Sequence, residues 1–344
     1  MDGEATSRLP ACPWCAIDAH AHWFPEEWIN LLEREGAANG AIVSTDKHGL
    51  RMVDGPKLPF KQAFPRDMTE LPIILQNMET ARIDLRILSL TNPMVYWAPD
   101  GFSLKLSQTF NDACAAACAA HPTKLRGAIM LPMQAPALAM EELERAARLP
   151  GMCCVYMALH VNGVNLHDRS FWPVYERLAD LKLPLCLHPV APCGKERMGE
   201  FHLSNLVGNP HESAIGAAYL IFGGVLDAFP SLQILLPHAG GSFPWLTGRW
   251  DNATRRRAKH EFAHMKQLPS AYLRRFHYDT ITHSPQIMRY LLEMVGAERV
   301  VIGTDYNWDA GYEFPVDFVE QIPGLTEAEK KQIMSETAKT LFPL

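Results

Sequence analysis

Short runs of apolar, often β-branched residues alternate with amphipathic stretches along almost the whole chain. In the amphipathic stretches apolar residues recur three and four positions apart, which is typical of helices, whereas the short runs are typical of buried strands. The runs predict strands at 15–19, 85–90, 125–131, 152–157, 183–187, 232–236, 276–279 and 300–302. The amphipathic stretches predict helices at 67–81, 103–120, 137–148, 171–181, 212–227, 244–259 and 285–295, and a C-terminal helical tail at 326–341.

The order of these elements predicts the fold class. Strands that alternate with helices form a parallel α/β sheet, and eight such units suggest a closed (β/α)8 TIM barrel. The alternative is an open, doubly wound sheet, which normally carries a glycine-rich first turn that binds a nucleotide. Here the first strand ends in His20-Ala21-His22 instead of glycines, which favours the barrel.

One insertion interrupts the barrel pattern after the first strand. Short strands at 41–45 and 50–53, joined by Asp46-Lys47-His48-Gly49, predict a small hairpin insertion at about 36–66. Residues 1–14 are interpreted as an N-terminal lead-in. Because the chain shows no internal repeat and no low-complexity linker, we expect a single domain over 1–344.

Composition narrows the class of protein. Hydrophobic residues make up 48% of the chain and charged residues 20%, as in ordinary globular proteins, and no apolar run is long enough to cross a membrane. Met1–Pro10 lacks the apolar block of a secretory signal, so we expect a cytoplasmic protein. The formal charge of −6 argues against a nucleic-acid or anionic-membrane partner.

The eight cysteines do not suggest a disulfide framework. Five of them stand in apolar surroundings and are interpreted as reduced core residues: Cys114, Cys118, Cys153, Cys154 and Cys186. The motif Cys12-Pro13-Trp14-Cys15 fits a redox pair, half a zinc site or simply part of the lead-in. We favour the lead-in, because the motif precedes a strand and no second C-x-x-C completes a zinc site.

Polar residues capable of binding a metal stand where several predicted strands end. They are His20 and His22 after the first strand, His188 after the fifth, His238 after the sixth and Asp305 after the eighth. Residues two apart on a strand face the same side, and a pair of imidazoles suits zinc, with a third histidine and a carboxylate completing the site. A single histidine at a strand end is usually structural, but burying this many titratable groups is unfavourable unless something pairs them. The set therefore predicts a metal site with room for an activated water.

Other residues suggest a small acidic substrate. His160 follows the fourth strand, Arg51 lies in the hairpin, and Arg255-Arg256-Arg257 lie on one helix. The arginine cluster fits a solvated surface as well as a carboxylate-binding role. Aromatic residues near strand ends fit either core packing or the walls of a pocket for a planar substrate: Trp97, Phe171, Trp172, Phe243, Trp245 and Trp308.

With these residues in view, the chain from Ile17 onward resembles the amidohydrolase superfamily. It is most similar to aminocarboxymuconate semialdehyde decarboxylases and related aromatic-acid decarboxylases. The matching stretches are Ile17-Asp18-Ala19-His20-Ala21-His22, Leu131-Pro132-Met133-Gln134-Ala135-Pro136, His160-Val161-Asn162, His188-Pro189, His238-Ala239-Gly240-Gly241-Ser242-Phe243-Pro244 and Gly303-Thr304-Asp305-Tyr306.

The resemblance assigns roles to the candidate residues. His20, His22, His188 and Asp305 would ligate one divalent ion, zinc with manganese as the alternative. His238 would act as the acid or base, and Asp305 would share in catalysis. Arg51, His160 and Trp308 would contact the substrate. Arg257, or else Arg255 or Arg256, would be donated across the interface of a homodimer.

The resemblance implies a non-oxidative decarboxylase of an aromatic or muconate-type carboxylic acid, active in the catabolism of aromatic compounds. The alternatives are a metal-dependent hydrolase or hydratase of a lactone, amide or ester, and a non-catalytic metal-binding scaffold. The chain departs from the family pattern at Val190, at Asn307-Trp308 and at Glu336-Thr337-Ala338. The first two departures touch the expected pocket, so they bear on the substrate.

Overall fold

Eight parallel strands form one sheet in the computed structural model, which describes residues 16–257, 261–308 and 310–344. In sheet order they are β1 (Ile17–His22), β5 (Leu85–Ser89), β6 (Leu125–Met130), β7 (Met152–Ala158), β10 (Leu185–His188), β11 (Ile234–Leu236), β12 (Phe276–Asp279) and β13 (Val300–Val301). All eight predicted strands are present. β1 extends beyond the predicted end at Ala19, so both histidines lie within the strand.

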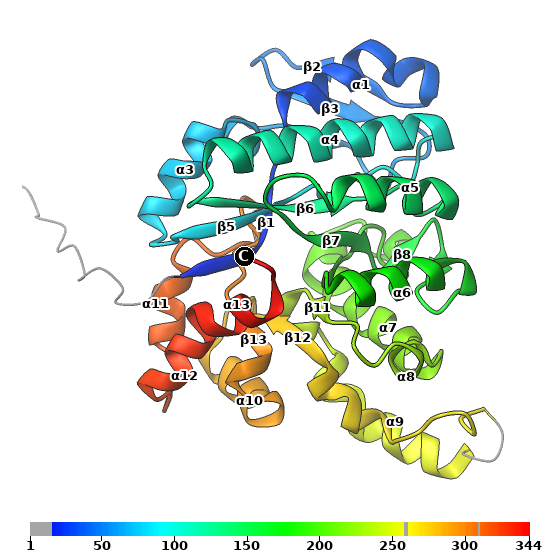
Figure 1. The fold of residues 1–344 in the computed structure, drawn as a ribbon, viewed down its shortest axis with the longest axis vertical. Coiled ribbons are helices and arrows are strands. Elements are labelled where there is room, and N and C mark those ends of the chain that lie inside the picture. The colour runs from blue at the N-terminus through cyan, green and yellow to red at the C-terminus, as the bar shows by residue number, and fades with distance from the viewer. Residues whose placement is uncertain (1–15, 258–260, 309) are drawn as a thin grey trace, which may run out of the picture.

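The sheet closes on itself between its first and last strands. Parallel bridges join Asp18 to Ile302 and Ala21 to Tyr306, and the Ala19 amide donates to the Ile302 carbonyl over 2.9 Å. The predicted (β/α)8 barrel is therefore confirmed, with helices around the strands (Figure 1). Because the strands are parallel, their carboxyl ends meet at one face of the barrel.

The helices follow the predicted order. They are α1 (Glu26–Asn39), α2 (Arg66–Thr69), α3 (Leu71–Thr80), α4 (Asp100–Ala120), α5 (Pro136–Ala146), α6 (Trp172–Leu181), α7 (Asn209–Phe222), α8 (Val225–Ala228), α9 (Phe243–Arg257), α10 (Pro285–Val295), α11 (Pro315–Glu320), α12 (Glu327–Lys331) and α13 (Thr337–Leu341). A π-helical turn at 332–336 joins α12 to α13, which confirms the helical tail.

Two predicted helices are divided, and two helices of the described residues, α1 and α11, were not predicted. The stretch 67–81 breaks at the extended residue Glu70, after which Pro72 occupies the first turn of a new helix. The stretch 212–227 breaks at Gly223 and Gly224, the latter left-handed. α1 was missed, although Trp28, Ile29, Leu31 and Leu32 have helical spacing and are buried.

The predicted hairpin is present and gains a third strand. β2 (Ile42–Thr45), β3 (Arg51–Asp54) and β4 (Gln62–Ala63) form an antiparallel sheet that lies beside α1 at one end of the molecule (Figure 1). A second, smaller hairpin, β8 (His160–Val161) and β9 (Val164–Asn165), follows β7. Both insertions leave the carboxyl ends of barrel strands, so they are placed to shape a site at that face.

Strands and helices together supply the buried core, and the five cysteines expected there are buried and free. None of the helices in the described ranges has the length and apolarity to cross a membrane. Residues 1–14, with Cys12, and the neighbouring Cys15 lie outside the described residues. The assignment of the whole chain to one domain stays a prediction.

Candidate metal centre and active site

Four side chains predicted as metal ligands converge at the carboxyl face of the barrel. His20, His22, His188 and Asp305 each offer one ligand atom, and these four atoms all lie within 4.8 Å of one another. All four side chains are buried. β1 supplies the first two, β10 the third, and the segment after β13 the fourth, so three segments far apart in sequence meet at one point.

The histidines of β1 are oriented by acceptors behind them. His20 Nδ1–H donates to Asp279 Oδ2 over 2.8 Å, and His22 Nδ1–H donates to Ser89 Oγ over 2.9 Å. The Ser89 hydroxyl itself donates to the Ala21 carbonyl, so its oxygen acts as the acceptor for His22. These bonds leave the Nε2 atoms of His20 and His22 directed at Asp305 Oδ1, at 3.5 and 3.0 Å.

His188 completes the cluster. Neither of its ring nitrogens has a hydrogen bond within the described residues, although both are buried. Its ring packs against Tyr156, with centroids 5.7 Å apart. Unpaired imidazole nitrogens and a carboxylate oxygen that face a common point repel one another unless a cation lies among them. The buried three-histidine, one-aspartate cluster therefore suits a divalent metal ion.

The pKa shifts of three of the four ligand candidates favour the protonation states that a metal needs. At His20 burial acts to lower the pKa, but the hydrogen bond to Asp279 and the neighbouring carboxylates raise it. Burial lowers the pKa of His22 to about 4 and that of His188 well below its ordinary value, so both are neutral near pH 7. Burial acts to raise the pKa of Asp305, but the contacts of its carboxylate with His22, His238 and His20 together hold that pKa well below its ordinary value. Neutral imidazoles and an ionised carboxylate are the forms that bind metals.

Two buried carboxylates that the sequence analysis did not single out support the cluster. Besides accepting from His20, Asp279 accepts from the backbone amides of His238 and Ala239 at 2.9 and 2.8 Å. Asp18 accepts from Arg86 Nε at 2.8 Å and from the Thr304 hydroxyl at 2.6 Å. Asp279 ends a strand, as the predicted ligands do, and this position was the signal that could have found it.

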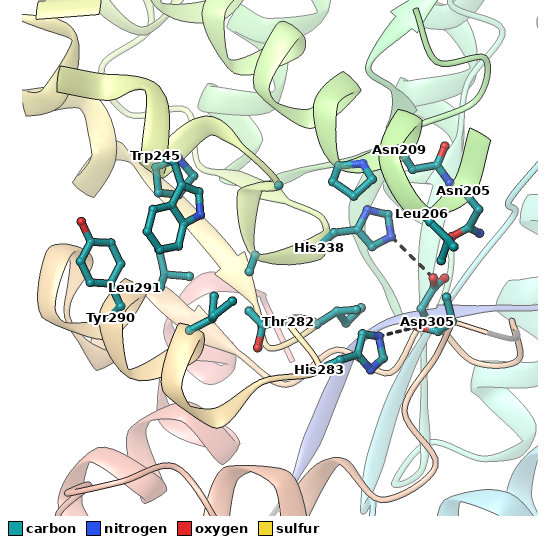
Figure 2. Close-up of a pocket in the computed structure, with 17 residues that line it drawn as sticks. Asn205, Leu206, Asn209, His238, Trp245, Thr282, His283, Tyr290, Leu291 and Asp305 are labelled. Carbon is teal, nitrogen blue, oxygen red and sulfur yellow. Dashed lines mark hydrogen bonds and ion pairs between the residues drawn. The ribbon is translucent and has the colours of Figure 1, made fainter. Parts of the chain in front are cut away.

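His238 lies beside the cluster and is not part of it. Its Nε2 is 3.5 Å from Asp305 Oδ2, and its side chain is 12% exposed. Figure 2 shows the ring pointing toward Asp305 from the loop that precedes α9. His238 and Ala239 both have left-handed backbones, at φ 54°. The hydrogen bonds from their backbone N–H groups to the Asp279 carboxylate stabilise this conformation. The ring is thus placed to exchange a proton with a molecule beside the cluster.

Two cavities adjoin the cluster, and Asp305 lines both. The α9-side cavity, of about 290 Å³, has His238 at its inner end and the stacked rings of Trp245 and Tyr290 further out (Figure 2). The hairpin-side cavity, of about 460 Å³, is lined by His188 and by residues of the hairpin insertion and of the loops after β10 and β13. The cluster therefore lies where the two cavities meet.

Of the other predicted site residues, some line a cavity and others do not. Trp308 and Val190 line the hairpin-side cavity. The departures from the family pattern at Val190 and at Asn307-Trp308 therefore fall at this cavity. Arg51 lines neither cavity; its guanidinium makes two hydrogen bonds to Glu26, at 2.8 and 2.5 Å. His160 also lies outside both, with Nε2 bonded to the carbonyl of Ala191, which does line the hairpin-side cavity.

Arg257 ends α9, which projects away from the barrel in Figure 1. Its guanidinium is 64% exposed and pairs with Glu261 at 3.1 Å. The structure therefore keeps Arg257 apart from the metal cluster of its own chain. Its role at the site, like those of the other predicted residues, stays a prediction.

Comparison with known proteins identifies the family. The family model described as Amidohydrolase matches residues 17–344. The chain belongs to the amidohydrolase family. A 2-amino-3-carboxymuconate-6-semialdehyde decarboxylase of Dictyostelium discoideum is 31% identical to this amidohydrolase over 327 residues, which cover 94% of this chain and 90% of that one.

Solved structures give the same fold. The 5-carboxyvanillate decarboxylase of Sphingomonas paucimobilis superposes with a TM-score of 0.80 and 25% identity, over 96% of this chain and 99% of that one. A dihydroxybenzoic acid decarboxylase of Polaromonas, solved with bound manganese and the inhibitor 2-nitroresorcinol, gives a TM-score of 0.76 and 25% identity, over 95% and 96% of the two chains. The family resemblance drawn from the sequence motifs is thus confirmed.

Proposed function

We propose that this amidohydrolase is a metal-dependent, non-oxidative decarboxylase of an aromatic or muconate-semialdehyde-type carboxylic acid. The observation that carries the proposal is the buried metal-binding cluster at the junction of two cavities, with His238 beside it. The decarboxylases named above, which share the fold, support the same reaction class.

In this proposal His20, His22, His188 and Asp305 hold one divalent ion. When bound, the ion supplies Lewis-acid polarisation of a substrate oxygen. We expect zinc, because three imidazoles and one carboxylate suit it. Manganese is the alternative, because the Polaromonas relative was solved with manganese bound.

The hairpin-side cavity is the proposed substrate site. Its volume of about 460 Å³ falls in the range of small-ligand pockets, whereas the α9-side cavity is smaller, at about 290 Å³. The apolar side chains of Phe60, Met68 and Val190 would contact the ring. Lys61 and Lys195 line the same cavity and would pair with a substrate carboxylate. Arg51 would reach the substrate only after leaving Glu26.

Decarboxylation requires one proton for each carbon–carbon bond broken. Carbon dioxide leaves, the electron pair of the broken bond stays on the substrate carbon, and that carbon takes up a proton. His238, which lines the α9-side cavity, would deliver this proton to a substrate carbon held where the two cavities meet at Asp305, whose Oδ2 lies 3.5 Å from His238 Nε2. His160 would act indirectly, by fixing the loop that contains Ala191.

We also propose a homodimer in which Arg257 completes the partner's site. The exposed position of Arg257 at the outer end of α9 supports this arrangement. Mixing His238→Ala chains with Arg257→Ala chains should restore activity if the arginine acts in trans, and should not if it acts within its own chain. We expect the protein in the cytosol, where the exposed free thiol of Cys193 stays reduced.

The test of the function begins with metal content. Elemental analysis of the wild type should find about one divalent ion per chain, and the His188→Ala/Asp305→Ala double variant should lose it. The metal-loaded enzyme should then release carbon dioxide from one or more members of a panel of aromatic and muconate-type acids. A product that gains one water and keeps its carbon would instead identify a hydrolase or hydratase. Full activity in a His238→Ala variant would contradict the role given to that histidine.

A further inference from the structure

A third cavity, of about 750 Å³, lies at the amino ends of the barrel strands. Gln233 precedes β11, His277 belongs to β12 and Arg299 precedes β13, and all three line it. α13, near the centre of Figure 1, supplies Thr340 and Leu341 to the same wall. The metal-binding cluster stands at the carboxyl ends of the strands, and this amino-end cavity shares no lining residue with the α9-side and hairpin-side cavities. It is therefore separate from the proposed substrate site.

Two buried nitrogen atoms of the residues that line the amino-end cavity lack hydrogen-bond partners within the described residues. They are His277 Nδ1 and Arg299 Nε, and His277 is only 6% exposed. Buried polar atoms in folded proteins nearly always have a partner, so two exceptions at one cavity indicate that a bound molecule supplies it. Arg299 Nε can only donate, and His277 Nδ1 donates when it carries the ring proton. The missing partner is therefore an acceptor.

The wall of the amino-end cavity carries a surplus of positive charge. Lys182 and Arg299 line it, and neither belongs to an ion pair within the described residues. Glu298 is the one carboxylate among the described residues that line the cavity, and it pairs with Arg274. Burial lowers the pKa of Arg299, an effect that the charge of Glu298 opposes, while Arg274 and Arg275 add to the lowering. A bound anion would neutralise charge that the protein leaves unpaired.

Apolar side chains complete the wall. Leu178 of α6, Leu183 before β10 and Leu341 of α13 line the same cavity. Its volume falls in the range of small-ligand pockets and exceeds what one inorganic anion fills. The cavity therefore suits an anion that carries an apolar group.

We propose that the amino-end cavity binds a phosphate monoester with an apolar organic group. Near pH 7 such a phosphate carries almost two negative charges and three strong acceptor oxygens. These match the cations Lys182 and Arg299 and the donor His277, whereas a carboxylate offers one charge and two oxygens. The organic group would contact the leucine side chains of the wall. The proposal assigns a second binding site and does not depend on the decarboxylase reaction.

Calorimetric titration of the full, metal-loaded chain with phenyl phosphate tests the proposal. Arg299→Met should weaken binding at least about ten-fold, the size expected for a lost hydrogen bond between charged groups. Lys182→Met should weaken it several-fold, and because Lys182 is exposed this variant keeps the test valid if Arg299→Met does not fold. Inorganic phosphate should bind more weakly than phenyl phosphate, because it leaves the apolar wall without a contact.

Matched controls separate this cavity from the substrate site and from a general effect of removing a charge. Arg126→Met removes a half-buried guanidinium of β6 that donates to the Pro122 and Leu125 carbonyls and lies outside the cavity. Lys61→Met removes a cation of the hairpin-side cavity. Both variants should keep the binding event that Arg299→Met loses. Thermal unfolding of each variant without ligand checks that it folds.

Several results would overturn the proposal. Binding that is lost in Lys61→Met and kept in Arg299→Met and Lys182→Met would place phenyl phosphate at the substrate site instead. No binding to the wild type, or equal affinity for inorganic and phenyl phosphate, would reject a site for a phosphate monoester. Carbon dioxide release plays no part in this measurement, so its result is independent of the proposed function.

Discussion

His20 and Asp279 are joined by a hydrogen bond of 2.8 Å between two fully buried side chains that lie 259 residues apart in the sequence. The same carboxylate accepts from the backbone amides of His238 and Ala239. Asp279 thereby fixes one metal-ligand candidate and the proton-transfer candidate at once. Burial acts to raise its pKa, but the hydrogen bonds from His20 and the Ala239 amide and the charges of the neighbouring histidines together outweigh that effect, so the carboxylate stays ionised.

Replacing Asp279 should weaken metal binding without removing a ligand. Both oxygens of Asp279 accept from N–H donors, so in Asp279→Asn the amide NH₂ faces donors whichever way the side chain is turned. The hydrogen bonds that orient His20 are therefore disrupted. We expect the affinity for zinc to fall by about 10–100-fold, the range seen when partners of metal ligands are replaced. Competition with a chromogenic chelator measures it. Asp112→Asn, an exposed carboxylate on α4, is the control, and equal zinc affinity in both variants would refute the role of Asp279.

Removing Asp18 should destabilise the barrel strongly. Asp18 and Arg86 are both fully buried and paired at 2.8 Å, and the guanidinium also lies 4.4 Å from the Tyr306 ring. Burial raises the pKa of Asp18, while Arg86 acts in the opposite direction. Asp18→Ala leaves a buried guanidinium without its carboxylate, so we expect a loss of about 3–5 kcal/mol in the free energy of unfolding, measured by urea denaturation.

The exposed pair of Arg66 and Glu70 provides the comparison for that loss. Glu70→Ala breaks an ion pair whose arginine side chain is 79% exposed, so it should lower the free energy of unfolding only slightly, far less than Asp18→Ala does. An equally small loss of unfolding free energy in Asp18→Ala would mean that the ion pair of Asp18 and Arg86 does not stabilise the fold.

His277 should make the protein sensitive to acid. Burial, followed by the charge of Arg299, lowers its pKa to about 3 from an ordinary value of 6.5, and its Nδ1 has no partner within the described residues. Because the folded-state pKa is depressed, the unfolded chain takes up a proton more readily than the fold. The stability is therefore fully present above pH 6.5 and declines as the pH falls toward 3.

Urea unfolding at pH 7, 6 and 5 measures this decline. The histidine contributes a slope of at most about 1.4 kcal/mol per pH unit, which a His277→Gln variant should lack. His121→Gln, at the end of α4 and half-buried, is the control. If the wild type and His277→Gln lose stability in parallel, His277 is not the group that titrates.

Two cations compete for the role of binding the substrate carboxylate. Lys61 lines the hairpin-side cavity, whereas Arg51 is 25% exposed and bonded to Glu26. We expect Lys61→Met to raise KM about ten-fold, as the loss of a charged hydrogen bond implies, and Arg51→Met to raise it less. Steady-state kinetics with the same acid measure KM for both variants. A larger effect in Arg51→Met would show that the arginine leaves Glu26 and contacts the substrate.

The sequence by itself determined the barrel and the four residues that meet in the candidate metal cluster. Strand periodicity and alternation with helices dictate a parallel sheet, and parallel strands bring His20, His22, His188 and Asp305 to one face because their carboxyl ends coincide. Each of these residues could be found from its own strand end, with no knowledge of its neighbours in space.

Only the tertiary structure decided what surrounds that cluster. The bond between His20 and Asp279, the pairing of Arg51 with Glu26 and the cavity shared by Gln62 and Asn92 each join segments that no local pattern relates. A local pattern records which face of a strand or helix is buried, but not which distant side chain it meets. The ligand set was therefore accessible from the residues and the reaction class from the family resemblance, whereas the residues that line the hairpin-side cavity depend on how the hairpin folds over the barrel.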